Sequence, residues 1–234
     1  MTAMAVAVLN RLPLTGNETV LDAGCGTGRV TELLLERLPH GHAIAIDADP
    51  EMIRVARQNL GARAEVRSAN LLELKLDQPV DAILSTATFH WILDHPRLFK
   101  QLFAALRPGG RLVAQCGGQG NIAELRTVAD LVALRPQFAR YYDGWTAPWY
   151  YASPEETVER LEAAGFIDAR AWLQPWPIVP ENPTEYAATV PLGAHVQQLP
   201  VELQDDFVDA VLEQLPEPLT VDYVRLNLEA RRPG

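Results

Sequence analysis

Three glycines in alternate positions follow a short apolar run near the start of the chain. Val20-Leu21 leads into Asp22-Ala-Gly-Cys-Gly-Thr-Gly28, and helical spacing begins at Arg29. Glycine lets the backbone turn sharply and approach a ligand closely. The free N–H groups at the start of the helix attract a group of partial negative charge. The loop therefore predicts a binding site for a small polar ligand.

The spacing of these glycines argues against two common nucleotide-binding motifs. A dinucleotide fingerprint, Gly-x-Gly-x-x-Gly, needs its third glycine where this chain has Arg29. A phosphate-binding P-loop ends in Gly-Lys-Ser or Gly-Lys-Thr, and this loop has no such ending. A nicotinamide cofactor or a nucleoside triphosphate is therefore disfavoured as the ligand.

Alternating strand-like and helix-like segments position this loop. Apolar or β-branched runs predict strands at 19–23, 43–47, 64–67, 80–85, 111–115, 167–173 and 221–231. Helical spacing and capping residues predict helices at 29–38, 50–60, 96–106, 154–165, 184–192 and 201–215. This alternation predicts an α/β fold, a Rossmann-like three-layer sandwich with a mostly parallel seven-stranded sheet and helical cover insertions.

Two segments interrupt the alternation, at residues 117–152 and 174–220. The second begins with the proline-rich run Gln174–Pro183, which is not expected to form regular structure. Ligands of such folds bind outside the carboxyl ends of the strands. We interpret both segments as covers over that edge of the sheet, within a single domain of residues 1–234.

Four more segments match one family in the expected order. Asp47 ends the second strand, 19 residues after Gly28, and Ser68-Ala-Asn-Leu71 follows the third. Residues 80–91 end in Phe-His-Trp after the fourth strand, and residues 106–112 form a turn into the fifth. With the glycine loop, this series resembles the class I S-adenosylmethionine-dependent methyltransferases over about residues 18–116. By resemblance, residues 1–234 form one methyltransferase domain.

The resemblance implies that the cofactor is S-adenosyl-L-methionine. The glycine loop would hold its methionine part, and Asp47 its ribose. Asn70 stands where relatives usually carry an acid toward the adenine, and its amide oxygen can still accept that hydrogen bond. Asp22 has an alternative role in ordering the loop. The expected cofactor-binding residues are Asp22, Gly24, Cys25, Gly26, Gly28, Asp47, Ala48, Asn70, Leu71 and Thr86.

His90 is the candidate catalytic residue. It follows the fourth strand between Phe89 and Trp91, and an imidazole titrates near neutral pH. It could act as a general base or contact the substrate. The alternative is that it orders the loop by hydrogen bonds.

A cluster of aromatic residues lies in the first cover. Six of the eleven residues from Tyr141 to Tyr151 are tyrosine or tryptophan. Such rings can shape an apolar cavity, or they can pack the cover onto the sheet. The expected substrate-binding residues are Trp91, Gln115, Trp149 and Tyr150.

The run Phe89-His-Trp-x-x-Asp-His95, together with Gln115, is similar to trans-aconitate methyltransferase-like small-molecule enzymes. This similarity implies methyl transfer to an oxygen, either a carboxylate or a hydroxyl. A tricarboxylate would need basic residues in the covers, where Arg126, Arg135 and Arg140 are available. Two alternatives stay open: a quinone- or sterol-like C-methyltransferase, and a protein that binds the cofactor without catalysis.

Many relatives carry an additional N-terminal helix over the cofactor. Only about 18 residues precede the first strand here. We therefore expect either a more open pocket or a natural start farther upstream.

Composition limits the partners. The 234 residues carry a net charge of −10 with no concentrated basic segment, which argues against nucleic acid. The chain has no apolar stretch of the roughly 20 residues that span a membrane, and its start does not resemble a signal peptide. Cys25 and Cys116 are too few for a zinc site, so no metal is expected. We expect a cytoplasmic monomer or homodimer whose partner is a small-molecule substrate.

Overall fold

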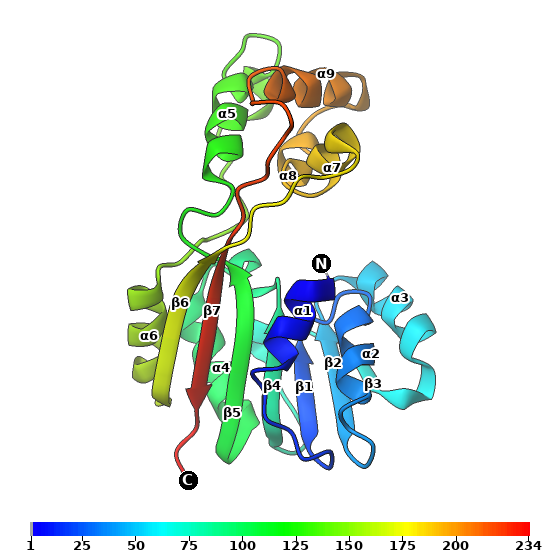
Figure 1. Ribbon diagram of the computed structural model, residues 1–234, viewed down its shortest axis with the longest axis vertical. Coiled ribbons are helices and arrows are strands. Elements are labelled where there is room, and N and C mark those ends of the chain that lie inside the picture. The colour runs from blue at the N-terminus through cyan, green and yellow to red at the C-terminus, as the bar shows by residue number, and fades with distance from the viewer. Residues whose placement is uncertain (1) are drawn as a thin grey trace.

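The computed structural model describes residues 2–234, in which seven strands form one sheet (Figure 1). The strands are β1 (Thr19–Ala23), β2 (His42–Asp47), β3 (Glu65–Ser68), β4 (Val80–Thr86), β5 (Leu106–Gly117), β6 (Ile167–Pro175) and β7 (Val224–Arg231). Their order is β3-β2-β1-β4-β5-β7-β6. Strands β1 to β5 run parallel, and β7 is antiparallel to both of its neighbours. The predicted fold class is confirmed.

Strand order reverses between β1 and β4. The chain moves outward from β1 to β2 and β3, and then returns to β4 on the other side of β1. Connections at such a reversal diverge to opposite faces of the sheet, which leaves a crevice at the carboxyl ends of the two strands. The glycine loop, which follows β1, therefore lies at this crevice.

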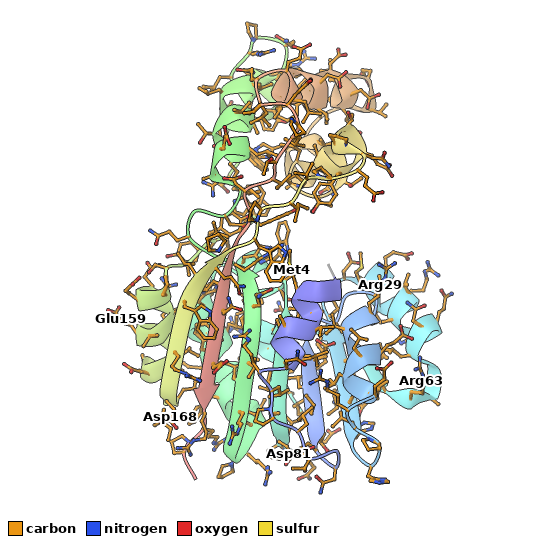
Figure 2. All side chains as sticks on the ribbon, viewed as in Figure 1. Met4, Arg29, Arg63, Asp81, Glu159 and Asp168 are labelled. Atoms are coloured by element: carbon orange, nitrogen blue, oxygen red, sulfur yellow. The ribbon has the colours of Figure 1, made fainter. Side chains whose placement is uncertain are left out.

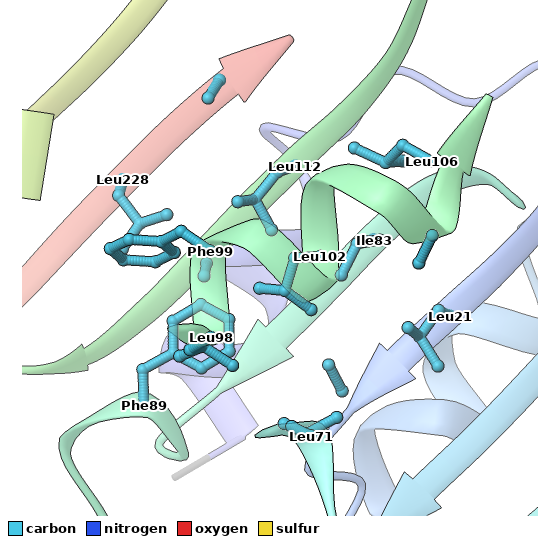
Figure 3. Packing of buried hydrophobic residues seen from close by; sticks show 14 of the residues in the cluster. Leu21, Leu71, Ile83, Phe89, Leu98, Phe99, Leu102, Leu106, Leu112 and Leu228 are labelled. Carbon is cyan, nitrogen blue, oxygen red and sulfur yellow. The ribbon is translucent and has the colours of Figure 1, made fainter. Parts of the chain in front are cut away.

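Helices cover both faces of the sheet. They are α1 (Thr2–Leu9), α2 (Arg29–Leu35) and α3 (Pro50–Leu60) on one face, and α4 (His95–Ala105) and α6 (Pro154–Ala163) on the other. Successive side chains of a strand point to opposite faces. Accordingly, Val20 packs with the first group and Leu21 with the second. Figure 3 shows Leu98, Phe99 and Leu102 of α4 packed over Ile83 and Leu112 of the sheet.

The predicted helix starts are confirmed where capping residues mark them. The Asp49 carboxylate accepts hydrogen bonds from the N–H groups of Glu51 and Met52, and α3 spans the predicted 50–60. Ser153 and Glu156 form a capping box at the start of α6. Side-chain acceptors satisfy N–H groups that the helix itself leaves without a partner.

Three strands differ by two residues or more from the sequence-based predictions. Strand β5 begins at Leu106, because both ends of the turn that follows α4 pair with β4 around a bulge. Strand β6 includes Gln174 and Pro175, which were predicted to be irregular. Trp176 N–H points inward to the Tyr223 carbonyl, so the nitrogen of Pro175 faces the open edge, where no donor is needed. Strand β7 begins at Val224, since Val221 forms only an isolated bridge with Ile178.

The cover segments form a helical cap beyond the carboxyl edge of the sheet (Figure 1). The cap consists of α5 (Ala123–Ala133), α7 (Pro183–Thr189), α8 (Gly193–Val196) and α9 (Val201–Leu212). Its interior is a hydrophobic cluster of its own, built around residues such as Phe138, Leu192 and Phe207. Helix α5 was not predicted from the sequence. None of the helices described is long and apolar enough to cross a membrane.

Candidate active site

A cavity of about 930 Å³ opens at the crevice. Small-molecule sites typically enclose roughly 300–1,000 Å³, so there is room for a cofactor and a second small molecule. Eight of the ten predicted cofactor-binding residues line it, namely Gly24, Cys25, Gly26, Asp47, Ala48, Asn70, Leu71 and Thr86. They come from the carboxyl ends of four neighbouring strands, as the fold rule requires.

The glycine loop needs glycine for two different reasons. Gly26 has a φ of +54°, and a Cβ there would meet no atom within 4 Å, because that side faces the open cavity. Gly24 also has a positive φ, but a Cβ there would lie 2.1 Å from Thr88 Oγ1. Gly26 therefore keeps the cavity open, whereas Gly24 lets the loop pack against the residues after β4.

Asp47 connects the end of β2 to this loop. Its Oδ2 accepts a hydrogen bond from Gly26 N–H at 2.9 Å, and its Oδ1 accepts one from Asp49 N–H at 2.9 Å. The N–H groups of Gly24 and Cys25 both donate to the Ile46 carbonyl. A carboxylate can accept about four hydrogen bonds, so each oxygen of Asp47 keeps a lone pair available to the cavity.

Asn70, which follows β3, lines the same cavity. Its side-chain oxygen accepts a hydrogen bond from Leu72 N–H at 2.9 Å and caps the short 3₁₀ helix Leu71–Glu73. An amide oxygen has two lone pairs. One acceptor position of Asn70 therefore remains for a ligand.

The residues after β4 form the next part of the wall. Thr86, Ala87 and Thr88 all line the cavity, and Thr88 Oγ1 donates to the Gly24 carbonyl at 3.1 Å. Ala87 has a φ of +56°, a left-handed conformation that costs an alanine roughly 1–2 kcal/mol. Strain of this kind is found where surrounding contacts hold a functional loop in one shape.

Asp22 and Gly28 lie behind the loop and do not line the cavity. Gly28 begins α2 and packs against Leu60 of α3. Asp22 is fully buried, and its Oδ2 accepts a hydrogen bond from the Thr31 hydroxyl at 2.7 Å. Its Oδ1 has no partner among the residues described. This geometry favours the loop-ordering role of Asp22 over direct contact with a ligand.

Burial of Asp22 makes the stability of the protein depend on pH. It raises the pKa of the carboxyl group from 3.8 to about 6, and the neighbouring charge of Asp47 adds to the increase. Between these two values the folded state binds more protons than the unfolded state, so stability falls as pH rises from 4 to 6. Above pH 6 the buried carboxylate costs about 3 kcal/mol.

The substitution Asp22→Asn should therefore stabilise the protein at pH 7.5, by about 2–3 kcal/mol more than at pH 4. Urea unfolding of both proteins at the two pH values measures the difference. Asp206→Asn, on the exposed side of α9, is the control and should show no such dependence. If the effect of Asp22→Asn is the same at both pH values, Asp22 does not have the raised pKa.

His90 is placed inside the wall, not on the cavity surface. It is buried in the 3₁₀ helix Phe89–Trp91, and its Nδ1 accepts a hydrogen bond from Gly117 N–H at 3.3 Å. Its carbonyl accepts one from Tyr150 N–H at 2.8 Å. Burial lowers the pKa of His90 to about 3, and the positive charge of Arg225 contributes. The geometry favours the loop-ordering alternative for this histidine.

The predicted substrate-binding residues fall into two groups. Trp91, which is 50% exposed, and Gln115 line the main cavity. Trp149 and Tyr150 instead line a separate cavity of about 390 Å³. The Tyr150 hydroxyl is already used, since it donates to Glu156 at 2.8 Å. The rings of Trp91 and Trp149 meet edge to face with centroids 6.0 Å apart, so the two groups are neighbours.

None of the three arginines expected in the cover segments lines the main cavity. Arg126 lines the smaller cavity, with its guanidinium 5.4 Å from the ring centroid of Tyr151. Arg135 and Arg140 line neither cavity. Within residues 2–234, no three acidic, histidine or cysteine side chains gather as metal ligands.

Two parts of the wall were not predicted from the sequence. Met4 and Ala5 of α1 line the cavity, and Figure 2 labels Met4. Helix α1 therefore supplies part of the cavity wall. Arg225 of β7 also lines it. The sequence gives no local signal for Arg225, because this strand closes the chain and reaches the site only through antiparallel pairing with β5.

Comparison with known proteins agrees with this geometry. Residues 20–110 match the family model described as a methyltransferase domain. The trans-aconitate 2-methyltransferase of Variovorax paradoxus is 30% identical over 96% of this chain and 88% of its own length. That of Delftia acidovorans is 32% identical over 95% and 81%. An uncharacterized methyltransferase of Schizosaccharomyces pombe is 31% identical, but the chain spans only 63% of its length.

Solved structures share the fold. The Bacillus subtilis YcgJ protein superimposes with a TM-score of 0.72, at 14% identity over the full length of both chains. Phosphoethanolamine N-methyltransferase 2 of Haemonchus contortus, solved with S-adenosylhomocysteine, gives a TM-score of 0.64 at 19% identity. That match covers 99% of this chain and 53% of the other. Taken with the nearly full-length sequence relatives, these matches show that the chain belongs to the class I S-adenosylmethionine-dependent methyltransferases.

Proposed function

We propose that this enzyme transfers the methyl group of S-adenosylmethionine to a carboxylate oxygen of a small organic acid. The observation that carries the proposal is the burial of His90, whose Nδ1 is hydrogen-bonded to Gly117. A group with a pKa of about 3 is a poor base for a hydroxyl or a carbon acid. A carboxylate is already ionised at neutral pH and needs no base.

The residues that line the cavity suit the cofactor. Gly26 leaves open space for the methionine part, and the free lone pairs of Asp47 suit the two ribose hydroxyls. Asn70 keeps an acceptor position for the adenine amino group. In this assignment Ala48 and Leu71 flank the adenosine, and Thr86 lies nearest the methyl group. When bound, the cofactor supplies an activated methyl group on a positively charged sulfur.

The protein then contributes mainly proximity and alignment. The acid occupies the part of the cavity beyond Thr86, where Trp91 and Gln115 form the wall. The half-exposed ring of Trp91 supplies an apolar surface at this end. The nearly full-length relatives named trans-aconitate 2-methyltransferase support a carboxylate acceptor for this chain.

The two cover segments, 117–152 and 174–220, belong in this proposal to the same domain as the sheet. Strand β6 lies between them in the sequence, and β7 follows the second. Both strands pair within the single seven-stranded sheet. Separation of the covers would therefore disrupt the sheet itself.

A methyl-transfer assay tests the proposed acceptor. The protein is incubated with S-adenosylmethionine labelled in the methyl group and with trans-aconitate, cinnamate, catechol or a ubiquinol. We expect label in a base-labile ester of an acid. Transfer to catechol or to a quinol carbon would refute the carboxylate proposal. Cofactor binding without any transfer would favour a binding protein.

Variants of His90 test the absence of a base. His90→Asn keeps an acceptor near the position of Nδ1, and its rate with the best acid should stay within tenfold of wild type. The wild-type rate should be flat between pH 6 and 8, because His90 titrates far below this range. A general base would instead give a loss of about 10²–10⁴-fold with unchanged cofactor affinity. Melting temperatures identify any variant that is merely less stable.

A further inference from the structure

Two arginines, Arg29 and Arg225, line the main cavity, and of the two only Arg225 is buried, with no acid in salt-bridge contact among the residues described. Arg225, on β7, is only 8% exposed. Its Nε is buried and has no hydrogen-bond partner among the residues described. Arginine is almost never buried unless it is paired, since an uncompensated charge inside a protein is costly. Arg225 is therefore a buried positive charge that lacks the partner such a group normally has.

The neighbours of Arg225 do not neutralise it. Its guanidinium carbon lies 4.3 Å from the ring centroid of Tyr223. The groups close enough to influence its charge are the phenols of Tyr223, Tyr186 and Tyr151 and the thiol of Cys116. Burial raises the pKa of Cys116 to about 12 and also raises the pKa of Tyr223 and Tyr151, so these groups are uncharged at neutral pH. The positive charge of Arg225 remains available to the cavity.

The sheet places this charge at the end of the cavity opposite the adenine side. Asp47 and Asn70 follow β2 and β3, whereas β7 lies three strands from β1 in the other direction. At about 4.8 Å per strand, β7 is roughly 14 Å from β1. Arg225 pairs in register with Gly117, two residues beyond Gln115. A cofactor bound between the glycine loop, Asp47 and Asn70 leaves this end of the cavity to the second substrate.

The neighbouring side chain is held in place. Gln115 Nε2 donates to Asn227 Oδ1 at 2.8 Å, and Asn227 in turn donates to Gln174 at 3.3 Å. Gln115 itself pairs in register with Thr86. Thr86, Gln115 and Arg225 thus form a continuous polar wall across β4, β5 and β7. A guanidinium at the end of such a wall presents paired N–H donors that match a carboxylate.

We infer that Arg225 is the group that binds a carboxylate of the acid substrate, through a charged and bidentate hydrogen-bonded pair. This inference rests on the proposed function and adds the binding group to it. Arg225 touches the substrate and not the cofactor, and it selects acids over uncharged molecules of the same shape. The bound carboxylate is the partner that Arg225 otherwise lacks.

The test uses Arg225→Met, with Arg231→Met as the matched control. Arg231 is on the same strand but pairs with Asp168 at 2.9 Å, away from the cavity. Each protein is saturated with S-adenosylhomocysteine and titrated calorimetrically with trans-aconitate, cinnamate and cinnamamide. We expect Arg225→Met to bind the acids about 10- to 100-fold more weakly, with cofactor affinity within about twofold of wild type. Arg231→Met should bind them normally, and the amide should bind poorly to all three proteins.

A stability measurement separates a ligand-binding arginine from a structural one. Without ligands, Arg225→Met should melt at or a few degrees above the wild-type temperature, since an uncompensated buried charge is removed. Addition of the acids should raise the melting temperature of the wild-type complex but not that of the variant. A variant that melts well below wild type would identify Arg225 as structural.

The outcomes distinguish this inference from the proposed function. Equal acid affinity in Arg225→Met and wild type overturns the role of Arg225 and leaves the methylation of acids in place. Acid binding that depends on Arg225 without any ester product supports the anion site and overturns the proposed reaction. Equal binding of cinnamate and cinnamamide, or no binding of either acid to wild type, overturns the anion site.

Discussion

Replacement of Gly26 by valine is expected to abolish cofactor binding while the protein remains folded. The Cβ position of Gly26 faces open space in the cavity, so the new side chain would occupy the volume assigned to the methionine part of the cofactor. Affinity for S-adenosylhomocysteine, measured by calorimetry, should fall at least about 10³-fold, because a rigid β-branched side chain cannot turn out of the way. The positive φ should cost roughly 1–2 kcal/mol of stability.

Gly109→Val is the control that distinguishes the cost of backbone strain from the steric block of the cavity. Gly109 also has a positive φ and open space around its Cβ position, but it does not line the cavity. This variant should lose a similar amount of stability and keep its cofactor affinity. Gly24 is unsuitable for this comparison, since a side chain there would collide with Thr88 and disturb folding. If Gly26→Val binds S-adenosylhomocysteine within tenfold of wild type, the cofactor does not occupy this loop.

Asp47→Ala should weaken cofactor affinity about 100-fold. Two ribose hydroxyls would lose a charged acceptor that is worth about 1.5–3 kcal/mol of cofactor affinity in all. The loop would also lose its contact from Gly26 N–H to Oδ2. Calorimetric titration with S-adenosylhomocysteine measures the loss.

The control for Asp47 is its neighbour Asp49. Asp49 also lines the cavity, but its carboxylate caps α3. Asp49→Ala should therefore lose about 1 kcal/mol of stability and little affinity. Unchanged affinity in Asp47→Ala would remove Asp47 from the site, and equal losses in both variants would indicate a general effect of charge.

Local sequence was sufficient for the part of the site that follows β1, β2 and β3. The glycine loop follows β1, Asp47 ends β2, and Asn70 lies two residues after β3. In parallel sheets these positions meet at one edge whatever the rest of the chain does. Seven residues predicted in this way line one cavity, and the family and cofactor inferred from the sequence are confirmed by the comparisons.

Side-chain burial could not be predicted in the same way. His90 has the position of an active-site base in the sequence, yet its ring is enclosed by Gly117 and Tyr151. Trp149 and Tyr150 belong to a cluster that suggests one pocket, but they line a second one. In each case the neighbours come from segments far apart in the chain, and a local pattern does not contain them.

The sequence by itself determined the fold class, the glycine loop and the order of the residues from β1 to β4 that line the cavity, because short motifs and strand–helix alternation encode them. The tertiary structure alone decided which further side chains line the cavity. Arg225 reaches the cavity because β7 runs antiparallel to β5 and pairs it with Gly117, more than 100 residues earlier in the chain. Met4 reaches it because α1 packs on the sheet beside α2. Strand pairing and helix packing, not local spacing, bring these two side chains to the cavity.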